Sequence, residues 1–474
     1  PEAGFLAKMR HTGGTSMHDA KRMIFAGALF AGLVGVQPLA GADLVAGPMV
    51  GHVTDKSARL WMEFPVAGQV TVTAFDVVHN EPVGGMRIGV EGPTPFVCDV
   101  PISGLQPNHA YRVEVKLNGE TVKLPEIALR TAPETGEEAT FTVAFGSGLD
   151  IAPMTPAAGG AAESEPVLVP HKLPIFRSIT TINPRAFFFL GGMGKLPEKL
   201  EDFPTTHRAA YRFITDFHTL IRREPDMQGL LNSTPCYALF DERDLGPAGV
   251  DSKFVFLQES LVAFQRFWPN PDWGTPENPG CFFTCSFGDA DFFMLDTRTF
   301  RSEQSLLGAP QLAWLEKGLK SSRASFKVIG ASCRLFGGGA KDAGDGWAKY
   351  PIEQADFLKW LEQNRVTGLI SLAGNQNVGS VSKFESAAGG LRYPIFMAGT
   401  SMLSPIAEAR TAANSPEVTE AGKETRIGGA AVRNSFGTLD FGGQNEHRFV
   451  TLRVRDETGK AVGEQTVLAQ QLRD

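Results

Sequence analysis

Four short loops hold polar side chains that could act together in chemistry. They lie at 147–148, 191–195, 241–249 and 374–378. Their candidate binding residues are Lys195, Asp241, Glu242, Arg243, Asp244, Asn375 and Asn377. Three carboxylates beside two cations can form ion pairs, and the cations alone could bind an oxyanion. None of the loops contains a histidine, so the set is a poor match to the anionic and imidazole ligands that a catalytic metal needs.

These loops follow segments that are expected to be buried strands. Continuous apolar runs recur at 141–145, 186–190, 237–240, 292–295, 327–331 and 368–372, with helical stretches at 311–319 and 352–363. Such alternation is typical of a layered α/β domain, here from about residue 139 to 474. Because ligands in these domains gather at loops after the carboxyl ends of strands, we expect the four loops to lie together.

Residues 43–134 have the pattern of a small β-sandwich. The stretch 69–75 alternates polar and apolar residues, as a half-buried strand does. The stretch 105–111 resembles the tyrosine corner of fibronectin type III domains, in which the hydroxyl of the tyrosine, here Tyr111, ties a turn to the backbone. Within the expected larger domain, 151–170 has no periodicity and indicates a surface loop.

The order of these segments resembles the PhoD-like alkaline phosphatases, a family of metallophosphoesterases. The resemblance rests on scaffold segments at 293–301, 307–315, 326–329, 345–351 and 434–437, with closing strands near 450–454. It implies a layered α/β/β/α metallophosphoesterase-like sandwich preceded by a fibronectin type III-like β-sandwich domain. It also implies that the four loops correspond to motifs that read roughly Ser-Cys, Gly-Asp-Asn-x-Tyr, Asp-Asp-His-Asp and Gly-Asp-x-His in the family.

The four motifs are degenerate in this chain. The replacements are Gly148 for a cysteine, Gly192 for an aspartate, Lys195 for a tyrosine, Arg243 for a histidine, Asn375 for an aspartate and Asn377 for a histidine. In the family, two metals polarise the phosphate and activate a water for in-line attack. Each replacement removes a metal ligand or a group that supports one. We therefore expect the fold to be kept, no residue to be catalytic, and no iron, calcium or other divalent pair to be bound.

The cations Lys195 and Arg243 admit two interpretations. They could form ion pairs with the acids at 241–244 and so replace the metals structurally, which predicts that Arg243→Ala lowers stability. Alternatively, they could form a pocket for an anionic small molecule or a phosphate-containing ligand. The corresponding functions are an inactive binding or structural homologue, or an active phosphoesterase that uses one metal or relocated ligands. A different hydrolase chemistry at Ser147 is a third possibility, although no Ser-His-acid set accompanies it.

The composition and net charge of the chain limit the classes of partner that it could bind. The chain has 474 residues and a net charge of −7, so it has no basic surplus for a general nucleic-acid binder. Five cysteines, all after residue 42, are expected to be buried core residues.

Residues 1–42 have the features of an upstream extension plus a cleaved signal peptide. A Lys-Arg pair precedes an apolar run at 23–36, and the small residues at 40–42 fit a cleavage site. As a helix the run would span roughly 21 Å, which is short of the hydrocarbon core of a membrane. The sequence therefore predicts an exported protein, periplasmic, cell-surface or extracellular, with no permanent membrane anchor.

Overall fold

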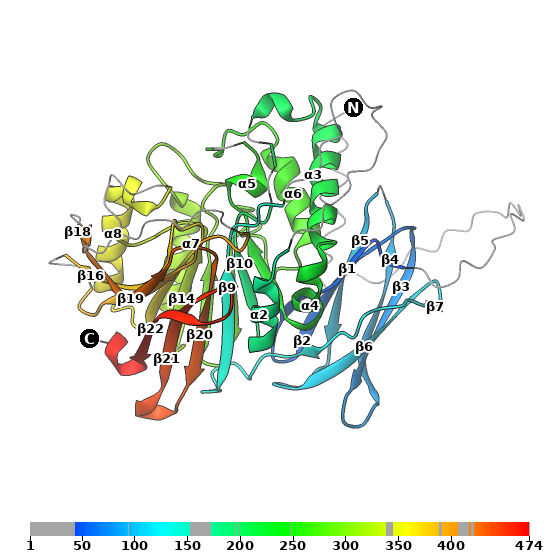
Figure 1. Cartoon of the computed structure of the whole chain (residues 1–474), viewed down its shortest axis with the longest axis horizontal. Coiled ribbons are helices and arrows are strands. Elements are labelled where there is room, and N and C mark those ends of the chain that lie inside the picture. The colour runs from blue at the N-terminus through cyan, green and yellow to red at the C-terminus, as the bar shows by residue number, and fades with distance from the viewer. Residues whose placement is uncertain are drawn as a thin grey trace, which may run out of the picture.

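The computed structural model describes residues 43–473 apart from 93, 152–171, 195, 198, 248, 338–344, 388–390, 406–416 and 419–420. The expected signal peptide, Lys195 and the expected surface loop at 152–170 lie outside the described residues. Within the described part, four β-sheets and their helices form two adjoining bodies, with the strands of residues 46–130 at one side of the molecule (Figure 1). No helix that the structure describes is long and apolar enough to cross a membrane.

The amino-terminal part is a sandwich of two antiparallel sheets. One has the order β1-β2-β5, and the other the order β4-β3-β6-β7 with β8 also paired to β6. The strands are β1 (Ala46–Val53), β2 (Ser57–Phe64), β3 (Gly68–Asp76), β4 (Pro82–Val90), β5 (Phe96–Ser103), β6 (Ala110–Leu117), β7 (Glu120–Thr121) and β8 (Leu129–Arg130). The expected tyrosine corner is present, because the backbone N–H of Gln106 donates to the Tyr111 hydroxyl at 2.7 Å. A closer likeness to fibronectin type III domains stays a prediction.

The first sheet of the larger part has the order β11-β10-β9-β20-β21-β22. Its strands are β9 (Phe141–Gly146), β10 (Phe187–Leu190), β11 (Cys236–Leu239), β20 (Ser435–Gly442), β21 (Phe449–Asp456) and β22 (Ala461–Leu468). Strands β9, β10 and β11 are parallel. Every residue of β10 and β11 is buried, which explains why these strands are apolar throughout instead of alternating.

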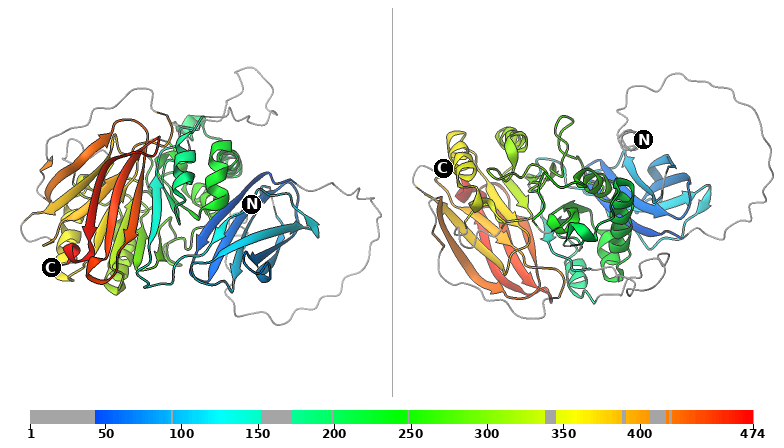
Figure 2. Two further views of the ribbon diagram at one scale, coloured as in Figure 1. Left: turned by 60° about the horizontal axis from the view of Figure 1, so that its bottom comes forward. Right: turned by 90° about the horizontal axis from the view of Figure 1, so that it is seen from above.

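The second sheet has eight strands in the order β12-β13-β14-β15-β17-β16-β19-β18. They are β12 (Phe283–Phe287), β13 (Ala290–Met294), β14 (Phe326–Ala331), β15 (Leu369–Ala373), β16 (Gly379–Ser386), β17 (Ile395–Gly399), β18 (Glu417–Val418) and β19 (Gly422–Ala431). The two sheets pack face to face (Figure 2). Part of the core between them is aromatic, since Phe188 of β10 stacks on Phe292 of β13 at 4.9 Å. The sheets therefore share one hydrophobic core.

Helices cover the outer faces of both sheets and complete the α/β/β/α arrangement. They are α2 (Ile175–Ile182), α3 (His207–Arg222), α4 (Pro225–Ser233), α5 (Glu242–Leu245), α6 (Leu257–Phe267), α7 (Gly308–Ser321) and α8 (Pro351–Gln363), with 3-10 turns at Leu200–Asp202, Trp347–Lys349, Asn445–His447 and Ala469–Leu472. Helix α2 contacts β20 of the six-stranded sheet. On the other side, Trp314 of α7 packs edge-on against Phe293 of β13. The layered α/β fold expected from the sequence is thus confirmed.

The sandwich is joined to the larger part by a buried cation–π cluster. The guanidinium of Arg222, at the end of α3, lies 5.1 Å from the ring of Trp61 in β2 and 4.3 Å from the ring of Trp268. Trp61 also donates its indole N–H to the carbonyl of Arg266 at 2.8 Å. Arg222 is 1% exposed, so this contact excludes water and couples the two parts of the chain.

Candidate functional site

The four polar loops meet at the carboxyl ends of the parallel strands, as the sequence predicts. Gly148, after β9, donates its N–H to the carbonyl of Gly191, after β10, at 3.0 Å. The N–H of Asn375, after β15, donates to the Ser147 hydroxyl at 2.7 Å. The loop after β11 joins through the N–H of Gly192, which donates to the Asp244 carboxylate at 2.7 Å. Both sheets therefore contribute to one site.

The backbone shape of these loops depends on residues with positive φ. Gly148, Gly192 and Asn375 have φ of 71°, 68° and 52°, a region that favours glycine and, among other residues, asparagine and aspartate. A Cβ built on Gly192 would lie 3.3 Å from the side-chain oxygen of Asn375 and from the Cα of Gly148. The three loops are thus packed closely at Gly148, Gly192 and Asn375.

Asp244 holds two of the loops together. Its carboxylate accepts hydrogen bonds from the N–H groups of Asp241 at 2.9 Å, Gly192 at 2.7 Å and Met193 at 2.6 Å. Burial raises the pKa of Asp244 to about 7, and these three hydrogen bonds oppose that rise. Its oxygens are occupied by the backbone, so Asp244 positions the loops and does not present a free ligand to the site.

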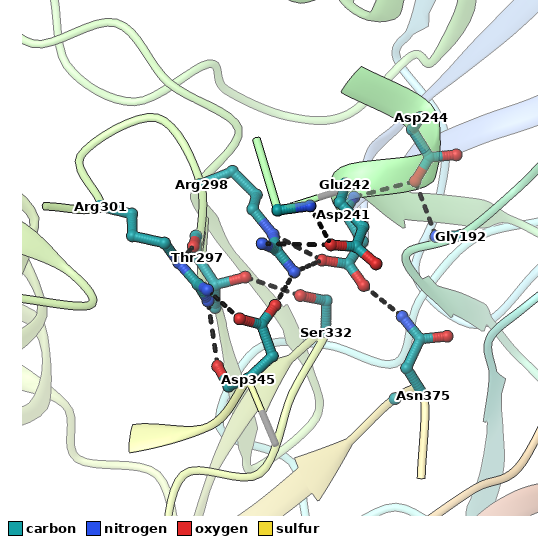
Figure 3. Close-up of polar contacts among 12 residues, drawn as sticks. Gly192, Asp241, Glu242, Asp244, Thr297, Arg298, Arg301, Ser332, Asp345 and Asn375 are labelled. Atoms are coloured by element: carbon teal, nitrogen blue, oxygen red, sulfur yellow. Dashed lines mark hydrogen bonds and ion pairs between the residues drawn. The ribbon is translucent and has the colours of Figure 1, made fainter. Parts of the chain in front are cut away.

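A buried guanidinium is the centre of the site. Arg298, which follows β13, is 1% exposed, and its Nε and Nη2 atoms lie 2.7 and 2.6 Å from Oδ1 of Asp241 (Figure 3). Its Nη2 also contacts the carboxylate of Asp345, and its Nη1 lies 3.8 Å from Oε2 of Glu242. Arg301 binds the other oxygen of Asp345. Burial lowers the pKa of Arg298, but Asp241, Asp345 and Glu242 more than offset that effect and raise it overall, so Arg298 stays charged.

The expected ion pairs of Arg243 were wrong. Arg243 is half-buried and makes no ion pair with any residue that the structure describes, and Arg298 takes the role that we assigned to it. The reason is helix geometry: Arg243 and Asp244 are consecutive residues of α5, and successive side chains on a helix point about 100° apart. A contribution of Arg243 or Lys195 to ligand binding stays a prediction.

Arg298 and Arg301 were missed because they belong to the scaffold segment at 293–301. Fifty-seven positions separate Arg298 from Asp241 in the sequence, so proximity along the chain gave no signal. Topology could have given one, because both arginines follow β13, which belongs to the same set of parallel strands as β15, and the loop at 374–378 follows β15. The carboxyl end of β13 therefore lies at the same edge of its sheet as that loop, where ligand-binding residues gather.

The two asparagines of the fourth loop, Asn375 and Asn377, are both exposed. The amide Nδ2 of Asn375 donates a hydrogen bond to Oδ2 of Asp241. Both oxygens of Asp241 are thus occupied, one by a guanidinium and the other by an amide. Asn375 therefore acts as a hydrogen-bond donor to Asp241.

The side chains present do not fit a two-metal centre. Gly148 and Gly192 have no side chain to offer, and the amide of Asn375 faces Asp241 as a donor. Among the described residues, no group of three or more His, Cys, Asp or Glu is arranged to hold a metal ion. Hard divalent cations require several converging oxygen or imidazole ligands, and the described site lacks such a set.

Comparison with known proteins supports the architecture. Residues 255–457 match the model of the PhoD-like phosphatase family, and residues 41–135 match a domain of unknown function (DUF7800). No curated protein matches the chain. A solved structure of PhoD is similar with a TM-score of 0.67 and 15% identity, over 91% of this chain and 93% of that one. Purple acid phosphatase PPD1 from yellow lupin (Lupinus luteus) seeds is similar with a TM-score of 0.61 and 13% identity, over 89% and 74%. At these identities the likeness shows the fold.

Proposed function

Since this chain carries a PhoD-like phosphatase domain, we propose that it is an exported homologue that has lost its metal centre and the activity that depended on it. In this proposal the protein acts through binding or structure, with an anionic small molecule or a phosphate-containing molecule as its ligand. Export is supported by the signal-peptide pattern in residues 1–42.

The observation that carries the proposal is the charge balance of the site without metal. Asp241, Glu242 and Asp345 contribute three negative charges, and Arg298 and Arg301 contribute two positive charges within the same network. Aspartates in place of glycine and asparagine at 192 and 375 would add two further negative charges, which only cations could balance. With those two acids absent, the two arginines leave the three carboxylates with only one uncompensated negative charge.

A divalent cation would also bind weakly in this site. Arg298 is fixed against Asp241, so a dication held by this carboxylate would be repelled by the guanidinium that already contacts it. A metal would need surplus carboxylates to overcome this repulsion. Asp241 cannot supply them alone, because both of its oxygens already accept hydrogen bonds.

Asp244 and Asp345 are also unsuited to activating a water molecule. General-base catalysis needs a side chain with a free acceptor in reach of the water. Asp244 is engaged by three backbone N–H groups, and Asp345 by two arginines. These contacts support a site that binds but does not hydrolyse.

The test combines metal analysis with turnover. The mature chain, residues 43–474, is purified, its iron, calcium, zinc and manganese contents are measured, and p-nitrophenyl phosphate and bis-p-nitrophenyl phosphate are supplied with each metal. We expect less than stoichiometric metal and no turnover above a mock purification. Stoichiometric metal with turnover that Asp241→Asn abolishes would overturn the proposal and favour the alternative, an active phosphoesterase with one metal or relocated ligands.

A reconstructed variant serves as the positive control. It combines Gly192→Asp, Arg243→His, Asn375→Asp and Asn377→His, which restores four of the family ligands. Because positive φ at 192 and 375 is tolerated by aspartate, the backbone should accept these changes. We expect manganese or zinc to raise the melting temperature of this variant and leave that of the natural chain unchanged.

A further inference from the structure

Two arginines from different parts of the chain converge on one neutral side chain, far from the site described above. Oδ1 of Asn108 accepts hydrogen bonds from Nη2 of Arg130 at 3.2 Å and from Nη2 of Arg185 at 2.6 Å. Asn108 and Arg130 belong to the amino-terminal sandwich, whereas Arg185 precedes β10. The candidate site lies beyond the other end of β10, about 13 Å away along the strand. The cluster is therefore a separate feature at the junction of the two parts.

The positive charges of this cluster are not compensated. Neither Arg130 nor Arg185 makes an ion pair within the described part of the chain, whereas some buried arginines do, such as Arg298 with Asp241 and Arg448 with Asp289. The chain has 52 acidic and 45 basic residues. The missing acid beside these two arginines is therefore not explained by a shortage of acids in the chain.

Arg185 also has an unused donor. Its Nη1 atom is buried and has no hydrogen-bond partner among the described residues. Burial, followed by repulsion from Arg130, lowers the pKa of Arg185 to about 10. The surroundings of Arg185 disfavour the charged form of its guanidinium, and an anion close to it would favour that charged form. The exposed Arg130 beside it gives such an anion a second contact.

We propose that Arg130 and Arg185 form a binding site for a small oxyanion that bridges the two parts of the chain. Both Nη2 atoms lie within hydrogen-bond distance of one oxygen, so they are less than about 6 Å apart, and two oxygens of one anion can accept from both. Guanidinium groups favour phosphate, sulfate and carboxylate because their planar donors match these oxyanions. Two positive charges favour a dianion, so phosphate or sulfate should bind more tightly than acetate.

The experiment is calorimetric titration of the mature chain with sodium phosphate at pH 8, with sodium chloride adjusted to hold the ionic strength constant. We expect one phosphate per chain, competition by sulfate, and weak competition by acetate. Arg130→Gln and Arg185→Gln should each weaken phosphate binding roughly tenfold or more, because each removes a charge-assisted contact. Arg177→Gln is the matched control: this residue lies exposed on α2 and makes no ion pair with a described residue, so its loss should leave the affinity unchanged.

Melting curves without phosphate establish that each variant is folded; if Arg185→Gln is not, Arg130→Gln and the charge-retaining Arg185→Lys decide the test. Binding that survives both glutamine substitutions would place the phosphate elsewhere, including at Arg243, and would overturn this proposal. Failure to bind phosphate would overturn it as well. Neither result bears on metal content or turnover, so the proposed function is tested separately.

Discussion

Replacing Arg298 by methionine should destabilise the protein strongly. Arg298 is 1% exposed and has two nitrogens within 2.7 Å of Oδ1 of Asp241. Charge centres about 4 Å apart at an effective dielectric of about 20 attract by about 4 kcal/mol. Removing one partner of a buried pair costs about 3–5 kcal/mol, because the other charge remains buried and unpaired. We expect a loss of that size, since Asp241 would keep only its contact with Asn375.

The assay is equilibrium unfolding in urea, followed by tryptophan fluorescence and by circular dichroism. Coincident transitions in both signals are needed before a single free energy is derived for a chain of this size. The matched control is Arg243→Met, which removes an arginine from the same site that makes no ion pair with a described residue, and which we expect to cost less than about 1 kcal/mol.

A second substitution separates lost charge pairing from lost packing. In Arg298→Met/Asp241→Asn, the unpaired carboxylate is also removed, so about half of the lost stability should return. The reasoning would be refuted if Arg298→Met were as stable as Arg243→Met. It would also be refuted by a double variant that is less stable than Arg298→Met, because the cost would then come from packing and not from an unpaired charge.

Three further perturbations have expected outcomes. Asn375→Asp places a second carboxylate against Asp241. At pH 8 the two negative charges repel, so the unfolding midpoint of this variant should be lower than that of the control Asn377→Asp. At pH 5, where the two carboxylates share a proton, the difference between the two midpoints should become smaller. Burial, followed by a nearby arginine, lowers the pKa of His52 to about 4; its contribution to stability is complete above pH 6.5 and is lost as the pH falls toward 4, by at most roughly 3 kcal/mol. His52→Gln should therefore flatten the decline in unfolding midpoint between pH 7 and pH 4.5, and an unchanged decline would exclude His52 as its source. Tyr111→Phe should cost about 1 kcal/mol of unfolding free energy through the lost corner hydrogen bond, and no measurable change would remove that role.

The layered fold could be predicted from the sequence because the burial of a strand determines the pattern of apolar residues along it. Strands β10 and β11 are apolar at every position since each is covered on both sides. The alternation in β3 reflects a sheet with one buried and one partly exposed face. The meeting of the loops also followed from topology, because parallel strands bring their carboxyl ends to one edge.

The ion pair between Arg298 and Asp241 could not be predicted in the same way. Which guanidinium reaches Asp241 depends on the directions of side chains from three loops, and distance along the chain says nothing about those directions. Arg243 is close to Asp241 in sequence but turns away on α5, whereas Arg298 arrives from the neighbouring sheet. Predicting such contacts requires the packing of the two sheets, which periodicity alone does not specify.

The three backbone hydrogen bonds to Asp244 have an evolutionary consequence. They hold the loops after β10 and β11 in place through the protein's own groups, so the shape of this edge does not depend on a bound ion. An ancestor built in this way could lose its ligands one at a time without unfolding, because each loss would affect catalysis and leave the scaffold in place. Selection for the fold and selection for the reaction could then separate, and a new ligand could be acquired on loops that were already ordered.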